Sequence, residues 1–150
     1  MSRELFYTES AEVTKRLGFL LGEELRLSFP GEHATVVALS GELGAGKTFF
    51  TKGIAEGLGI RSRVQSPTFV LMKRYSISKS VFHDLWHVDC YRIGSVRELR
   101  SLGFKNILED PGNIVVIEWP ERIAKILPHK MLRISFVHDT LHTRSIEMRS

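Results

Sequence analysis

The chain has 150 residues, of which 43% are hydrophobic and 25% are charged, and its formal net charge is +4. These values are close to globular averages, so they exclude a mainly disordered chain and predict one compact domain over residues 1–150. A single cysteine excludes an internal disulfide, and no apolar run approaches the roughly 18 residues that cross a bilayer. The N-terminus lacks the apolar stretch of a secretory signal, so we expect a cytoplasmic protein without a membrane partner.

The first half of the chain has the pattern helix, strand, glycine-rich loop, helix. Ser10 precedes apolar residues at three- and four-residue spacing, which predicts an amphipathic helix over about 10–28. The apolar, β-branched run Ala34–Leu39 is typical of a buried parallel strand. The glycine-rich loop follows this strand directly, and residues 47–58 favour a second helix that closes with two glycines.

The second half combines short strands and short helices. Residues 69–75 and 81–88 predict two strands joined as a hairpin, so we expect a mixed sheet. A capping-box pattern, Ser95 to Glu98, predicts a short helix that ends at Gly103. The apolar run Ile114–Ile117 predicts a second buried strand. A short helix to Leu127 and two closing strands, 131–137 and 143–148, complete an expected α/β fold with a mostly parallel sheet flanked by helices.

Residues Gly41–Thr48 match the whole phosphate-loop pattern of Gly, four residues, Gly, Lys and Thr. The glycines permit positive φ values, so consecutive backbone amides turn toward phosphate oxygens. We expect Lys47 to meet the terminal phosphates and the Thr48 hydroxyl to bind Mg²⁺. A predicted strand and a predicted helix flank the loop, as the motif requires. This setting favours a P-loop NTPase-like protein that binds ATP; the alternative is a glycine-rich turn with an ordinary surface lysine.

Two acids follow apolar strands and are candidates for the chemistry beside this loop. Glu118 follows the strand Ile114–Ile117 and is the best candidate for the carboxylate that holds magnesium or its waters, with a solvated strand-end acid as the alternative. Asp89 fits either a general base for γ-phosphate hydrolysis or a structural strand-end acid. His83 and His87 have no evident third ligand, so we do not expect a zinc site.

Four segments together closely resemble the TsaE family, also called YjeE, the ATPase of bacterial tRNA threonylcarbamoyladenosine synthesis. The likeness covers about residues 10–127, and the matching segments occur in the family's order: Leu39–Phe49, Val64–Phe69, His87–Arg92 and Ile117–Arg122. Ser10, Thr14, Leu17 and Gly18 of the first predicted helix also match. Beyond Leu127 the match is weak.

The resemblance implies roles for individual residues. Thr68 resembles a switch residue that senses the γ-phosphate, and Asp89 resembles the acid needed for hydrolysis. Trp119 resembles the family's tryptophan beside the magnesium acid, with core packing as the alternative, and Ser10 is expected near the nucleotide's base. The magnesium ligands would be Thr48 and Glu118, and the nucleotide loop would comprise Gly41, Gly44, Ala45, Gly46, Lys47, Thr48 and Phe49.

The resemblance also implies that the protein works with partners. It would join TsaB and TsaD, and its slow Mg-dependent ATP hydrolysis would support transfer of a threonylcarbamoyl group to adenosine 37 of ANN-decoding tRNAs, which it contacts only through the complex. A small-molecule kinase is one alternative, although no arginine-rich lid segment is evident. A nucleotide-dependent binding module without useful turnover is another. A GTPase is disfavoured, because neither Asn-Lys-x-Asp nor Asp-x-x-Gly occurs.

Overall fold

The computed structural model describes residues 2–67 and 69–150. The described elements are one seven-stranded sheet, four α-helices and one 3₁₀ helix. The strands are β1 (Arg3–Thr8), β2 (Thr35–Ser40), β3 (Met72–Ser76), β4 (Asp84–Asp89), β5 (Asn113–Glu118), β6 (Leu132–His138) and β7 (Arg144–Arg149). The helices are α1 (Ala11–Leu27), α2 (Lys47–Gly57), α3 (Val96–Ser101), α4 (Phe104–Glu109) and η1 (Pro120–Ile126).

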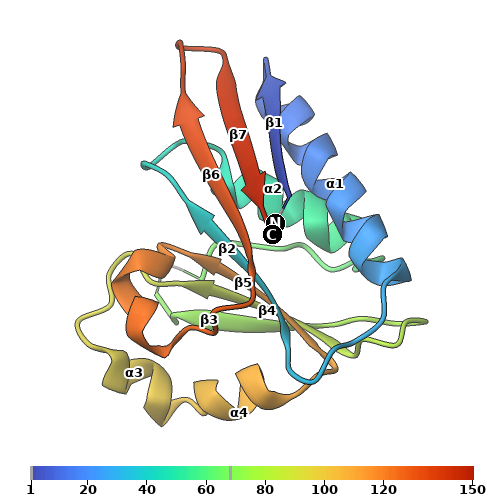
Figure 1. Cartoon of the computed structure of the whole chain (residues 1–150), viewed down its shortest axis with the longest axis vertical. Helices are drawn as coiled ribbons and strands as arrows, with labels where there is room; N and C mark the ends of the chain where they lie inside the picture. Colours follow the sequence, from blue (N-terminus) through green and yellow to red (C-terminus); the bar gives the residue numbers. More distant parts are fainter. Residues whose placement is uncertain (1, 68) are drawn as a thin grey trace.

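The sheet has the strand order β1-β7-β6-β2-β5-β4-β3 (Figure 1). Its centre is parallel, because β2 pairs with β5 and β6, and β5 pairs with β4. The outer pairs are antiparallel hairpins or edge pairings: β3 with β4, β6 with β7 and β1 with β7. The predicted mixed sheet flanked by helices is confirmed. The sequence predicts a mostly parallel sheet, whereas in the described sheet only the central strand pairs are parallel and the outer pairs are antiparallel.

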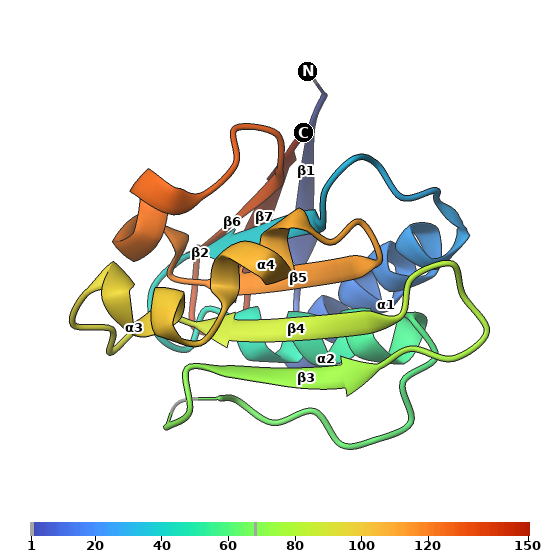
Figure 2. The same cartoon turned by 90° about the horizontal axis from the view of Figure 1, so that it is seen from below.

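Helices cover both faces of the sheet. α1 and α2 lie on one face, and α3, α4 and η1 lie on the other (Figures 1 and 2). The central strands bury alternate side chains in these two layers, as strand geometry requires. Val37 and Val116 belong to the core beneath α1 and α2, whereas Val36 and Val115 belong to the core beneath the shorter helices. Central strands that are buried on both faces explain the unbroken apolar runs in the sequence.

Two elements differ from the sequence-based expectation. β1 is an edge strand whose side chains are mostly exposed, so no buried alternation marks it, and it forms by pairing with β7. Gly103 ends α3 as expected. It has a φ of 79° and directly precedes α4, a helix that the sequence does not predict. A helix of six residues is too short to show periodicity. Among the described helices, none combines the length and apolar character that a bilayer crossing requires.

Four glycines bring the backbones of α1 and α2 into direct contact. A Cβ atom at Gly18 or Gly22 would collide with carbonyl oxygens of α2, at Phe50 and Ile54 respectively. Gly53 and Gly57 face carbonyl oxygens of α1 in the same way. Each helix thus presents two glycines four residues apart to the other, which permits an approach that any side chain would prevent. This contact fixes α1 against the helix that begins at the phosphate loop.

Gly53→Ala is expected to destabilise the fold by about 3 kcal/mol, since overpacking a fixed backbone contact outweighs the gain of about 1 kcal/mol in helix propensity. Urea unfolding followed by circular dichroism measures the free energy of unfolding. Gly31→Ala is the matched control, because a Cβ atom there meets no other atom within 4 Å. Equal stability of the two variants would contradict the close helix contact.

Candidate functional site

A cavity of about 500 Å³ lies at the carboxyl ends of the central parallel strands. Ligands bind at this edge in open α/β sheets. The register places Asp89 of β4 opposite Glu118 of β5, and Glu118 opposite Leu39 of β2, so the predicted acids and the phosphate loop meet. The cavity is lined by Leu43, Gly44, Ala45, Gly46, Lys47, Thr48, Phe49, Ser66, Asp89, Tyr91, Arg92, Glu118 and Trp119.

The loop between β2 and α2 has the backbone geometry of an anion site. Gly41, Gly44 and Gly46 have φ values of 145°, 75° and 105°, which side-chain-bearing residues rarely adopt. α2 begins directly after Gly46, and no side chain caps its N-terminus. Its first amide groups therefore remain available to an anion, and the helix dipole adds to the attraction.

Lys47 is buried at the wall of this cavity. Its ammonium group donates hydrogen bonds to the carbonyl oxygens of Gly41 and Glu42, the latter at 3.1 Å, and lies 4.1 Å from the centre of the Trp119 ring. Burial lowers the pKa of Lys47, and the carboxylates of Glu118, Glu121 and Asp89 oppose that shift. The loop and Trp119 thus hold a cation at the wall of the cavity.

A buried chain of hydrogen bonds links the start of α2 to β5 and β4. The Thr48 hydroxyl donates to Oε1 of Glu118 at 3.2 Å, and His87 Nε2 lies 3.2 Å from Oε2 of the same carboxylate. Because a carboxylate only accepts hydrogen bonds, His87 donates from Nε2. His87 and Glu118 are almost fully buried. Within the described residues Nδ1 of His87 has no partner. His87 thus orients the acid that faces Thr48.

The oxygen atoms of Thr48 and Glu118 suit a hard divalent cation. In the described part of the chain, no group of three or more His, Cys, Asp or Glu residues is placed to hold a metal ion. Mg²⁺ in nucleotide sites needs only one or two protein oxygens, because phosphates and water supply the rest. The residues present therefore fit a magnesium ion that arrives with a nucleotide.

Asp89 lies at the end of β4 and is partly buried. Its Oδ1 accepts a hydrogen bond from the Tyr91 amide at 3.0 Å, and the Ser66 hydroxyl lies 3.5 Å from Oδ2. Burial raises the pKa of Asp89, and the Glu118 carboxylate adds to the shift, whereas the hydrogen bond from Tyr91 opposes it. A carboxylate with a raised pKa is a better proton acceptor than an ordinary surface aspartate.

Two residues beside the loop come from the C-terminal hairpin, for which the sequence predicts no site residue. His138 Nε2 lies 2.8 Å from the carbonyl oxygen of Gly44. Arg144 packs beside Gly46, and its buried Nε atom has no hydrogen-bond partner among the described residues. No local motif marks either residue, since only the pairing of β6 with β2 brings the hairpin to the loop. Ser66, Tyr91 and Arg92 lie within the matched segments, and the sequence alone assigns them no role.

Several predicted residues have other positions. Ser10 caps α1, accepting a hydrogen bond from the Val13 amide at 3.2 Å, and is not among the cavity-lining residues; its contact with a base stays a prediction. Phe49 and Trp119 both line the cavity, and Trp119 also packs against the second core; its role beside a magnesium ion stays a prediction. Thr68 lies outside the described residues.

Comparison with known proteins identifies similar chains. The family described as threonylcarbamoyl adenosine biosynthesis protein TsaE matches residues 8–146. The chain is 39% identical over 131 residues to the tRNA threonylcarbamoyladenosine biosynthesis protein TsaE of Treponema pallidum, covering 85% of this chain and 87% of that protein. It is 42% identical over 105 residues to the protein of the same name from Bacillus subtilis, covering 70% and 61%.

A solved structure is also similar. The crystal structure of YdiB from Bacillus subtilis superposes with a TM-score of 0.76 at 32% sequence identity. The alignment covers 98% of this chain and 84% of that one. The likeness therefore includes the C-terminal hairpin.

His87→Leu should lower the free energy of unfolding by about 2 kcal/mol, because it leaves a buried Glu118 oxygen without its donor. Chemical unfolding in urea measures the change. His129→Leu, at an exposed position, is the control. If His87→Leu proved as stable as this control, the imidazole would not be supporting Glu118.

Asp89→Asn should be more stable than the wild type at pH 7. The pKa of Asp89 is raised in the folded state above its ordinary value of 3.8. At any pH at which Asp89 of the unfolded chain is ionised, this shift lowers the stability of the folded state. The amide removes that cost and keeps the acceptor for Tyr91. As pH falls through the raised pKa toward 3.8, the difference between variant and wild type should disappear. A gain that is constant with pH, or no gain, would contradict the shift.

Proposed function

Because the chain belongs to the TsaE family of threonylcarbamoyl adenosine biosynthesis proteins, we propose that its cavity binds Mg-ATP and hydrolyses it in support of tRNA modification. One observation carries this proposal: the glycine-rich loop, Lys47, the Thr48–Glu118 pair and Asp89 converge on a single cavity. An ordinary surface turn would leave its lysine exposed to solvent, because burying a charged group costs free energy. Here Lys47 is buried beside two acids.

The residues divide the work of phosphoryl transfer. Amides of the loop and of the first turn of α2 receive the phosphates, and Lys47 offsets their charge. Thr48 and Glu118 would hold the magnesium ion, which supplies neutralisation of charge on the terminal phosphates. Asp89, opposite Glu118, would orient a water and accept its proton, with Ser66 and the Tyr91 amide fixing its carboxyl group.

The setting of this activity is a partner complex in the cytosol. We expect TsaB and TsaD to bind the chain, to stimulate its slow hydrolysis and to contact the tRNA. A partner-dependent site is consistent with exposed apolar side chains here: Leu43 and Phe49 line the cavity, and Phe69 lies against Arg92 of its lining. Thr68, between Pro67 and Phe69, remains the predicted sensor of the γ-phosphate.

Two variants separate binding from turnover. Lys47→Ala should weaken Mg-ATP binding by about tenfold or more, because it removes a charge-assisted contact to phosphate. Asp89→Asn should bind Mg-ATP as the wild type does but lose hydrolysis by about a hundredfold or more. Isothermal titration measures binding, and phosphate release in the presence of TsaB and TsaD measures turnover.

The same proteins reconstituted with tRNA test the function itself. Threonylcarbamoyladenosine should form with the wild-type chain and fail with either variant. Modification at the full rate without this chain would reject its role, and rapid phosphorylation of a metabolite by the chain alone would favour a kinase. Turnover that Asp89→Asn leaves unchanged would remove Asp89 from the mechanism.

A further inference from the structure

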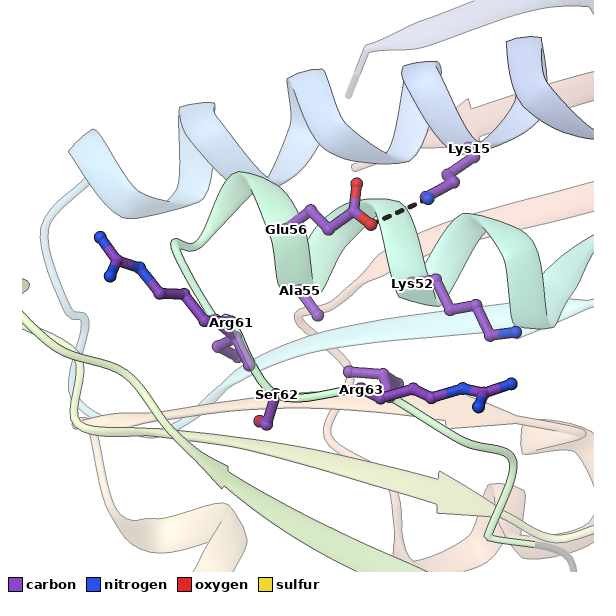
Figure 3. Close-up of a pocket in the computed structure, with 9 residues that line it drawn as sticks. Lys15, Lys52, Ala55, Glu56, Arg61, Ser62 and Arg63 are labelled. Carbon is purple, nitrogen blue, oxygen red and sulfur yellow. Dashed lines mark ion pairs between the residues drawn. The ribbon is translucent and has the colours of Figure 1, made fainter.

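A second cavity, of about 280 Å³, lies beside α2, outside the site described above. Figure 3 shows the residues around it, which come from α1, from α2 and from the segment that follows α2. Four are cationic and one is anionic: Lys15, Lys52, Arg61, Arg63 and Glu56. The proposed ATPase function uses none of them.

The charges of this basic pocket are only partly balanced. Lys15 Nζ lies 2.8 Å from Oε1 of Glu56, and this contact bridges α1 and α2. Lys15 donates this hydrogen bond to Glu56, which raises the pKa of Lys15, so the two form a charged pair. Lys52, Arg61 and Arg63 make no ion pair within the described part of the chain. Three positive charges therefore remain available to an anionic ligand.

The shape of the pocket favours carboxylates over a nucleic acid strand. Its floor is apolar, because Ala55, Ile60 and Val64 are buried beneath the charged groups. In Figure 3, Arg63 and Lys52 extend to one side, whereas Arg61 extends to the other. A phosphodiester backbone needs a continuous cationic track, and single-stranded RNA also needs aromatic surfaces, which the lining residues lack. Glutamate and aspartate combine apolar methylenes with isolated charges and fit both features.

We propose that this basic pocket docks an acidic segment of a partner protein, with Arg61 and Arg63 as the main anchors. Arginine clusters recognise acidic motifs in this way. The proposal rests on the proposed function only in taking the TsaB–TsaD assembly as the partner to be tested.

The pocket is connected to the nucleotide cavity by two segments of chain. Lys52 lies one helical turn after Thr48 on α2. Residues 61–64 lead through Gln65 to Ser66, which lines the nucleotide cavity. The Gln65 amide donates a hydrogen bond to the Tyr75 hydroxyl at 3.2 Å and so anchors this segment. An acidic partner seated in the pocket would therefore hold the segment that ends beside Asp89, which gives the partner a route to influence turnover.

The test compares two charge-reversal pairs of equal net charge. Arg61→Glu/Arg63→Glu alters the pocket, and Arg97→Glu/Arg100→Glu alters exposed positions on α3, on the opposite face of the sheet. A fluorescent glutamate-rich peptide and the purified TsaB–TsaD assembly serve as probes at low and moderate salt. The pocket pair should bind both probes about tenfold more weakly and with less salt dependence, while the α3 pair binds as the wild type does.

Controls make each outcome decisive. Both double variants should bind Mg-ATP like the wild type, which would show that they fold. If Arg61→Glu/Arg63→Glu does not fold, Arg61→Gln/Arg63→Gln replaces it and should give an intermediate loss of binding to both probes. Equal weakening by the two pairs, or no weakening, would overturn the proposal. Loss of tRNA binding with unchanged binding of peptide and assembly would assign the pocket to RNA instead. Should wild-type chain fail to bind Mg-ATP or the assembly, the proposed function fails, while the peptide comparison still decides the pocket.

Discussion

The parallel pairing of β5 with both β2 and β4 is the constraint on which the site depends. It aligns three strand ends at one edge, so that Asp89 lies opposite Glu118, and Glu118 lies opposite Leu39, just before the phosphate loop. None of these residues is near another in the sequence. A shift of one residue in either pairing would turn the acids to the wrong face of the sheet, because side chains alternate along a strand. The buried apolar cores on both faces fix the register.

The acids at this edge are tolerated because each is paired. Glu118 is almost fully buried, yet Thr48 and His87 donate to its two oxygens. Lys47 is buried against two carbonyl oxygens and an aromatic ring. Burying a charged group costs free energy unless hydrogen bonds compensate for the lost water. This arrangement therefore lowers the stability of the fold, but it holds the groups of the site in fixed orientations. Asp89 is the least compensated of them, in agreement with its raised pKa.

The sequence predicted those parts of the structure that have a local signal. The phosphate loop and Glu118 follow continuous apolar runs, and Ser95–Glu98 forms the expected capping box. The sequence could not predict β1 or α4, since an exposed edge strand and a six-residue helix lack periodicity. It also gave His138 and Arg144 no role, because only the sheet order carries the C-terminal hairpin to the loop. Contacts made by tertiary pairing leave no trace in a local pattern.

The glycine contacts between α1 and α2 have a mechanical consequence. Because the two backbones are in direct contact, a shift of one helix along or around the other would create steric clashes. We therefore expect α1 and α2 to move as one rigid body, with Lys47 and Thr48 at one end. Motion that accompanies the proposed ATP hydrolysis would then have to occur elsewhere in the chain. The described residues between α2 and β3, 59–67 and 69–71, form no helix or strand, and some of them line both cavities, so this connection is where such motion would be accommodated.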